Sequence, residues 1–93
     1  MRRSIVVGNW KMNLTKQQAT ELGAAVAAVV GNSTDVDIAV CPSFGFLDCV
    51  GKALGDSNVK LGAQTLNAND AGAFTGEVSG PMLRDLGCQV VII

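Results

Sequence analysis

The sequence predicts an α/β fold in which four parallel strands alternate with three helices, βαβαβαβ, and form the N-terminal portion of a (β/α)8 barrel. Two observations predict it. Short β-branched runs alternate with segments of helical periodicity, and a new strand begins about every 30 residues, as in right-handed βαβ units. At 93 residues the chain suffices for one domain and not for two. We therefore expect residues 1–93 to form a single partial domain.

The first strand and helix are predicted from a β-branched run and a capping motif. Ser4–Asn9 has an apolar centre, which suits a strand covered on both faces. Thr15 and Gln18 then have the spacing of a capping box. Apolar residues follow at helical intervals as far as Gly31-Asn32, a typical helix stop. These signals predict a helix over Lys16–Val30.

The same cycle repeats in the middle of the chain. Val36–Cys41 has the composition of a strand and stops at Pro42. Ser43 can cap a second helix, which Gly55 ends. A third strand is expected at Val59–Gln64.

A long segment, Thr65–Val78, has neither helical nor alternating periodicity and contains one aromatic residue, Phe74. Loops of more than about 12–15 residues are usually functional or disordered. The aromatic residue favours a rigid loop that docks into a partner surface over a flexible insertion. Ser79-Gly80-Pro81 then begins a short helix that Gly87 ends, and Gln89–Ile93 is the last predicted strand.

A barrel is predicted because four such strands leave one edge unpaired and one face of the sheet uncovered. The last predicted strand has no partner at its outer edge, and three helices cover at most one face of the sheet. Closing the sheet into a β/α barrel removes the edge and turns the second face into a filled interior. Closure takes eight strands and about 250 residues, so this chain would supply a little under half of the barrel.

Composition excludes several classes of function. Seven basic and eight acidic side chains give a net charge of −1, so we expect no nucleic acid partner and no anionic membrane surface. No apolar stretch approaches the roughly 20 residues that span a bilayer. The apolar run after Arg2 and Arg3 is too short for a signal peptide. The chain has no histidine, which excludes a histidine-based triad or metal site within it.

The three cysteines, Cys41, Cys49 and Cys88, are an odd number and form no Cys-x-x-Cys pair. This pattern argues against a disulfide framework and against a zinc site. We expect all three to be buried free thiols. Free thiols predict a reducing compartment, the cytoplasm.

Functional groups of parallel α/β proteins gather at the carboxyl ends of the strands. Asn9 and Lys11 follow the first strand directly, and a period of two would place both on one side of an extended chain. Lys11 there offers a fixed positive charge for a phosphate or for a developing oxyanion. The alternative is a solvated lysine after a strand. Asp35 and Asp37 lie at the opposite end of the next strand and are expected to be solvated.

Three motifs resemble the triosephosphate isomerase family, in the family's order and at its spacing. They cover the chain from end to end, and they are Gly8-Asn9-Trp10-Lys11-Met12-Asn13; Gly62-Ala63-Gln64 followed by Gly72-Ala73-Phe74-Thr75-Gly76-Glu77-Val78-Ser79; and Met82-Leu83-Arg84-Asp85-Leu86-Gly87 leading into Val91-Ile92-Ile93. Thr65 and Ala71 depart from the family's usual asparagine and serine. These departures affect how the long loop is pinned and leave the chemistry untouched.

The resemblance implies a TIM barrel and an isomerase of glycolysis and gluconeogenesis. Its reaction would interconvert dihydroxyacetone phosphate and D-glyceraldehyde 3-phosphate through an enediolate. Asn9 and Lys11 match the family's substrate-binding pair, and Lys11 matches its catalytic electrostatic element. The resemblance implies no metal and no cofactor. The family's histidine and its glutamate base lie in sequence that this chain does not contain, and in the family's mechanism they polarise the substrate and take its proton.

The resemblance also implies a homodimer formed through the loop Thr65–Ser79. The tip of that loop would insert into the neighbouring subunit, and the residues expected at the interface are Met12, Asn13, Phe74, Thr75, Gly76 and Glu77. Lys11 would then be positioned partly by the other protomer, which gives a physical reason for a dimeric enzyme.

Alone, the 93 residues are expected to be inactive, because they need the remainder of the barrel from the same gene product or from a complementing chain. An alternative from another class is a non-catalytic half-barrel that associates through its open edges and apolar inner face. A third reading is a different phosphate-binding β/α barrel enzyme, which the Asn-Trp-Lys motif disfavours.

Overall fold

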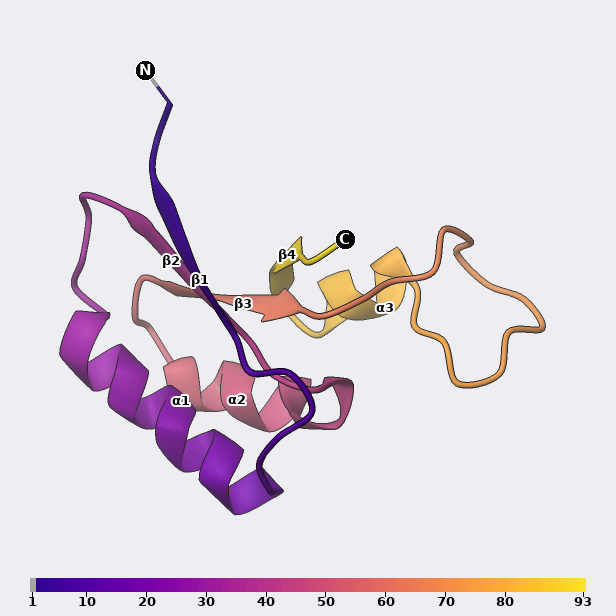
Figure 1. The fold of residues 1–93 in the computed structure, drawn as a ribbon, viewed down its shortest axis with the longest axis horizontal. Helices are drawn as coiled ribbons and strands as arrows, with labels where there is room; N and C mark the ends of the chain where they lie inside the picture. Colours follow the sequence, from indigo (N-terminus) through magenta and orange to yellow (C-terminus); the bar gives the residue numbers. More distant parts are fainter. Residues whose placement is uncertain (1) are drawn as a thin grey trace.

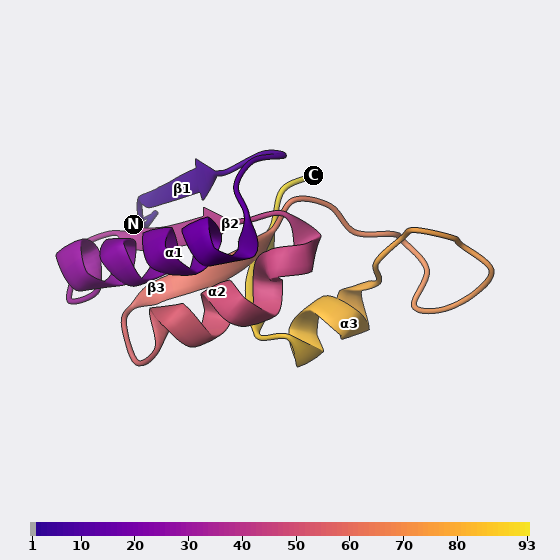
Figure 2. The ribbon, with the colours of Figure 1, turned by 90° about the horizontal axis from the view of Figure 1, so that it is seen from below.

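The computed structural model describes residues 2–93, in which four parallel strands in the order β1-β2-β3-β4 form one curled sheet (Figure 1). Helices connect the strands, and Figure 2 shows α2 and α3 on the same side of the sheet. The elements are β1 (Ile5–Asn9), α1 (Lys16–Val30), β2 (Asp37–Cys41), a 3-10 turn (Phe44–Phe46), α2 (Leu47–Leu54), β3 (Val59–Ala63), α3 (Gly80–Asp85) and β4 (Cys88–Val91). The predicted fold class is confirmed: this is the curled N-terminal part of a (β/α)8 barrel.

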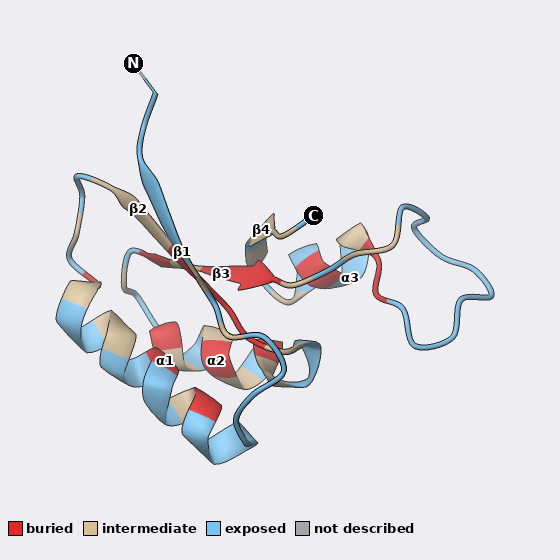
Figure 3. Ribbon diagram, viewed as in Figure 1, coloured by how far each residue is buried: buried red, intermediate tan, exposed pale blue. Residues whose placement is uncertain are grey.

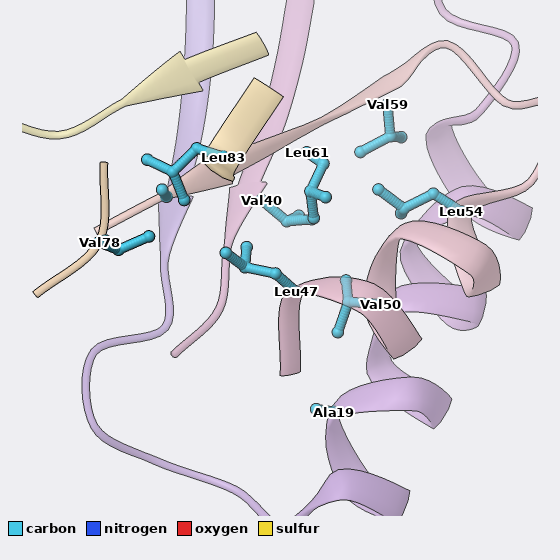
Figure 4. Close-up of a cluster of buried hydrophobic side chains, with 10 residues drawn as sticks. Ala19, Val40, Leu47, Val50, Leu54, Val59, Leu61, Val78 and Leu83 are labelled. Atoms are coloured by element: carbon cyan, nitrogen blue, oxygen red, sulfur yellow. The ribbon is translucent and has the colours of Figure 1, made fainter. Parts of the chain in front are cut away.

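The core lies between β2, β3 and the helices (Figure 4). Its members are buried apolar side chains, namely Ala19, Val40, Leu47, Val50, Leu54, Val59, Leu61, Ala63, Val78 and Leu83. In Figure 3 the buried residues concentrate on β2, β3 and α2, whereas β1 and the long loop before α3 are exposed. Alternating strands and amphipathic helices therefore bury one face of the sheet, as the periodicities predict.

Helix α1 begins and ends at the predicted residues. The side chain of Thr15 accepts from the backbone N–H of Gln18, and the Gln18 side chain accepts from the backbone of Thr15, which completes the capping box. The helix approaches α2 closely at Gly23, where an added Cβ would lie 3.2 Å from Val50. Gly31 ends the helix with φ −66°, so the stop does not use the left-handed conformation.

The coverage expected for the first strand is wrong for the described residues. Ile5, Val6 and Val7 are 50%, 60% and 43% exposed. The reason is geometric: β1 pairs with β2 on one side, and within residues 2–93 no strand pairs with its other side. The strand's β-branched, apolar sequence fits a covered position that four strands do not provide.

Several element boundaries differ from those predicted. The first three strands are each one residue shorter, at Ile5–Asn9, Asp37–Cys41 and Val59–Ala63. Ser43 does not cap a helix with its side chain, and a 3-10 turn precedes α2. Helix α2 begins instead at Leu47, with no side-chain cap. The last strand, β4, is Cys88–Val91 rather than Gln89–Ile93. Strand ends depend on pairing, and β4 pairs with β3 only through Val91.

Asp37 is not simply solvated, contrary to expectation. Its Oδ1 accepts from Arg3 Nε at 2.9 Å and lies 3.7 Å from Lys60 Nζ. The hydrogen bond from Arg3 lowers the pKa of Asp37, desolvation opposes this effect, and the charges of Arg3 and Lys60 add to the lowering. The cluster ties the start of β2 to Arg3, two residues before β1, and to β3.

The three cysteines are free thiols, as predicted, but only Cys41 is fully buried. Cys49 and Cys88 are half-buried, so the prediction of burial is wrong for them. No helix among residues 2–93 has the length and apolar character needed to cross a membrane.

Candidate functional site

The carboxyl ends of β1, β2 and β3 lie side by side and carry the candidate site. Asn9 is the last residue of β1 and pairs in register with Cys41, the last residue of β2. Gln64 directly follows β3. Because the strands are parallel, the segments that follow them emerge at one edge of the sheet.

The loop after β1, residues 10–15, is held in a specific turn. Asn9 Oδ1 accepts from the backbone N–H of Lys11 at 2.9 Å, and Asn13 Nδ2 donates to the carbonyl of Trp10 at 2.8 Å. Lys11 and Leu14 have positive φ angles of 55° and 80°. The chain is therefore not extended at Lys11, and the period-of-two argument for its direction does not apply; a local hydrogen bond joins Asn9 to Lys11 instead.

Two side chains from the neighbouring strand ends hold the carbonyl oxygen of Lys11. Gln64 Nε2 donates to it at 2.8 Å and donates to the carbonyl of Cys41 at 2.9 Å. Ser43 Oγ donates to the same Lys11 oxygen at 2.9 Å. The backbone N–H of Trp10 also donates to Cys41, at 3.1 Å. The backbone at Lys11 is thus fixed to the ends of β2 and β3.

Sequence reasoning assigned no role to Gln64 and gave Ser43 a different one. These residues lie 53 and 32 positions from Lys11 along the chain, so no periodicity or local motif could predict the contacts. One available signal was position alone: Gln64 ends a predicted strand, and Ser43 lies two residues after the end of another.

The side chains of Asn9 and Lys11 are exposed at this edge. Within residues 2–93 no carboxylate pairs with Lys11 Nζ. The Oδ1 of Asn9 is engaged by the loop, which leaves its amide N–H groups as the donors that face solvent. An exposed ammonium and an exposed amide, carried by residues that a hydrogen bond joins, are groups that suit an anionic ligand such as a phosphate.

The long loop, Thr65–Ser79, projects from the body of the molecule as an arm in both ribbon views (Figures 1 and 2). Its base is closed by a bridge between Asn67 and Ser79 and by a 2.7 Å hydrogen bond from the Asn67 N–H to the Val78 carbonyl. Asn67 Nδ2 also donates to Glu77 at 3.1 Å. These bonds make the arm an ordered element.

The tip of the arm is exposed and does not contribute to the edge where Lys11 lies. Phe74 is 47% exposed and packs against the backbone of Gly72, whose φ is 142°. Met12, in the loop after β1, is 93% exposed. The structure therefore brings Asn9 and Lys11 together and leaves Met12, Asn13 and the arm tip (Phe74, Thr75, Gly76 and Glu77) as separate exposed surfaces.

Among residues 2–93, no three histidine, cysteine or acidic side chains gather closely enough to hold a metal ion. Cys41 contributes its carbonyl oxygen to the edge, and burial raises the pKa of its thiol. Burial raises the pKa of Cys88 as well, and the neighbouring Cys41 adds to the rise. A raised pKa keeps a thiol protonated and unreactive.

A family profile described as "Triosephosphate isomerase" matches residues 4–93. Curated relatives with that name include a protein of Magnetococcus marinus, 49% identical, and one of Moorella thermoacetica, 48% identical. A third, from Chlorobium phaeovibrioides, is 50% identical. Each match covers the whole of this chain and 37–38% of the relative, so the chain spans a little over a third of the length of these relatives.

Proposed function

Because the chain belongs to the triosephosphate isomerase family, we propose that it forms the first part of an isomerase that interconverts dihydroxyacetone phosphate and D-glyceraldehyde 3-phosphate. The substrate class follows from the family. The chemistry that this chain would contribute follows from its own residues at the carboxyl edge of the sheet.

The observation that carries the proposal is the pairing of Asn9 with Lys11. Lys11 carries an exposed ammonium, which pairs with no carboxylate within residues 2–93, on a backbone that Ser43 and Gln64 fix and that donates its N–H to Asn9 Oδ1. Such a pair would bind the phosphate of a triose phosphate. Lys11 would also stabilise the negative charge that develops on the substrate oxygen when a proton leaves the neighbouring carbon.

The proton itself would be moved by groups outside this chain. The chain has no histidine, and within residues 2–93 no acidic side chain pairs with Lys11. We therefore propose that catalysis requires the chain together with the strands that close its barrel, called here the complete barrel. The 93 residues alone would be inactive, and no metal or cofactor would take part.

The arm supports a second element of the proposal, a homodimer. Its closed base and exposed aromatic tip are the features of an ordered segment that inserts into another molecule. In a symmetric dimer each arm tip, Phe74–Glu77, would lie against Met12 and Asn13 of the other subunit, next to Lys11. The free thiols support a reducing compartment, and we place the protein in the cytoplasm.

One assay tests this function. The native protein that contains this chain is purified, its intact mass is measured under denaturing conditions, and interconversion of the two triose phosphates is followed. We expect activity in material that holds this chain and the rest of the barrel, as one polypeptide or two. Absence of isomerisation in such material would overturn the proposal.

The exposed apolar strand β1 favours one other function, a half-barrel that associates without catalysis. Under that alternative the purified material would contain only a 9.6 kDa species that self-associates. The same mass measurement therefore separates the two.

A further inference from the structure

Ser43 lies where the sequence predicts a helix cap, yet its hydroxyl does not cap. The N–H of Phe46, three residues later, donates to the backbone carbonyl of Ser43 at 2.9 Å, so the turn is closed without the side chain. The half-buried hydroxyl donates instead to the carbonyl of Lys11 at 2.9 Å, on the neighbouring strand end. Local structure does not account for this hydroxyl, since the turn forms without it.

The count of donors at the Lys11 carbonyl shows what the hydroxyl supplies. A carbonyl oxygen has two lone pairs, and a side-chain amide has two N–H groups. Gln64 uses its amide on two oxygens, those of Lys11 and Cys41. Ser43 supplies the second bond to Lys11. Without it one lone pair of this oxygen would have only solvent as a partner.

The conformation of Lys11 makes that second bond consequential. Its φ of 55° lies in the left-handed region, which is unfavourable for a residue with a side chain. Such a conformation persists where surrounding contacts over-determine it. The direction of the lysine side chain depends on this backbone, so freeing the carbonyl would let the peptide plane rotate and redirect the ammonium.

We infer that Ser43 is a positioning residue for Lys11: its hydroxyl holds the Lys11 carbonyl and thereby fixes the left-handed backbone that aims the ammonium at the anionic ligand. The inference rests on the proposed function for the identity of that ligand, a phosphate ester. Ser43 does not itself touch the ligand in this scheme.

The test uses the complete barrel and three variants. Ser43→Ala removes the hydroxyl, and Ser43→Thr keeps it. Thr20→Val is a matched control, because Thr20 Oγ1 also donates to a backbone carbonyl, that of Lys16 at 2.8 Å in α1, away from the site. Two quantities are measured: NMR order parameters of residues 10–13 without ligand, and the affinity for glycerol 3-phosphate, a phosphate ester that cannot isomerise.

We expect Ser43→Ala to lower the order parameter at Lys11 from about 0.85 toward 0.6. We expect it to weaken glycerol 3-phosphate binding about two- to tenfold, the contribution of one hydrogen bond. Ser43→Thr should restore both quantities, and Thr20→Val should leave both at the wild-type value although it too loses a hydroxyl.

An unchanged order parameter at Lys11 in Ser43→Ala would overturn the inference, whatever the ligand. A loss of order at Lys11 in Ser43→Ala that Ser43→Thr does not restore would also overturn the inference, even if Thr20→Val keeps the wild-type order. The effect would then not belong to the hydroxyl. If the proposed function is wrong, the wild-type complete barrel will neither bind glycerol 3-phosphate nor isomerise triose phosphates. The order parameters of the three variants still decide the role of Ser43 in that case.

Discussion

The side-chain amide of Gln64 donates to the backbone carbonyl of Lys11 at 2.8 Å across 53 residues of sequence. The same amide nitrogen bonds Cys41, so one side chain joins the carboxyl ends of three neighbouring strands. The geometry of the candidate anion site therefore depends on strand pairing, because Gln64 can hold the loop after β1 only when β3 lies beside β2.

Gln64→Glu should therefore disrupt the site with almost no change in side-chain volume. A carboxylate accepts where the amide donates, so it would face the carbonyls of Lys11 and Cys41 without a hydrogen to share. We expect a loss of about 1–3 kcal/mol of folding stability and at least a tenfold drop in turnover by the complete barrel. Gln18→Glu is the control, since Gln18 uses its side-chain oxygen as an acceptor, which glutamate retains. Equal effects of the two variants would contradict the role of Gln64.

Lys11→Ala should remove most turnover and leave the fold intact. The ammonium is exposed and unpaired within residues 2–93, so its loss breaks no internal contact. Removing one group that stabilises transition-state charge costs roughly 10²- to 10³-fold in kcat. Steady-state kinetics with circular dichroism would measure both properties. Lys16→Ala, which removes an exposed lysine at the start of α1, should change neither property. Near-normal turnover of Lys11→Ala would show that Lys11 is only a solvated surface residue.

Thr75→Arg should dissociate the proposed dimer and lower activity. The arm tip is exposed in the single chain, so arginine is tolerated there but would be excluded from a close-packed interface. Sedimentation velocity should report a monomer for Thr75→Arg and a dimer for Asn32→Arg, which places the same charge on an exposed residue after α1. An unchanged sedimentation coefficient for Thr75→Arg would rule out this arm as the interface.

Gly62→Ala should destabilise the sheet. An added Cβ would lie 2.5 Å from Cys41 Sγ and 2.6 Å from Val90 Cγ2, at the point where β3 and β4 shift register. Overpacking of this kind costs about 1–3 kcal/mol in the free energy of unfolding. Gly45→Ala is the control, because no atom lies within 4 Å of its Cβ position. Chemical denaturation of both variants measures the difference.

The ion pairs of Asp37 predict a pH-dependent contribution to stability. Its pKa is lowered in the folded state, chiefly by the hydrogen bond from Arg3, so the charged form is favoured by folding. This contribution is present above the ordinary pKa near 4 and is lost as pH falls through the lower folded value. Asp37→Asn should therefore be less stable than wild type at pH 7, with the difference closing as the pH falls below the lowered pKa of the folded state. Asp35→Asn, which removes an exposed carboxylate outside this cluster, is the matched control.

Much of the fold could be predicted because periodicity and capping are local. The bounds of α1 follow from the Thr15–Gln18 capping box and from apolar residues at helical spacing, and both lie within the helix itself. The parallel order of the strands follows from their alternation with helices. Ser43 was misassigned for the complementary reason: its local sequence resembles a cap, and a partner 32 residues away takes its hydroxyl instead.

The sequence by itself determined the α/β class, the strand order and the family, because each depends on residue spacing or on contiguous motifs, and it singled out Asn9 and Lys11 as a prediction. Only the tertiary structure decided that Lys11 adopts a left-handed turn, that Gln64 and Ser43 share its carbonyl, and that Asp37 is paired rather than solvated. Hydrogen bonds between strand ends depend on register and sheet curvature. These are properties of the packed sheet, and no stretch of sequence carries them alone.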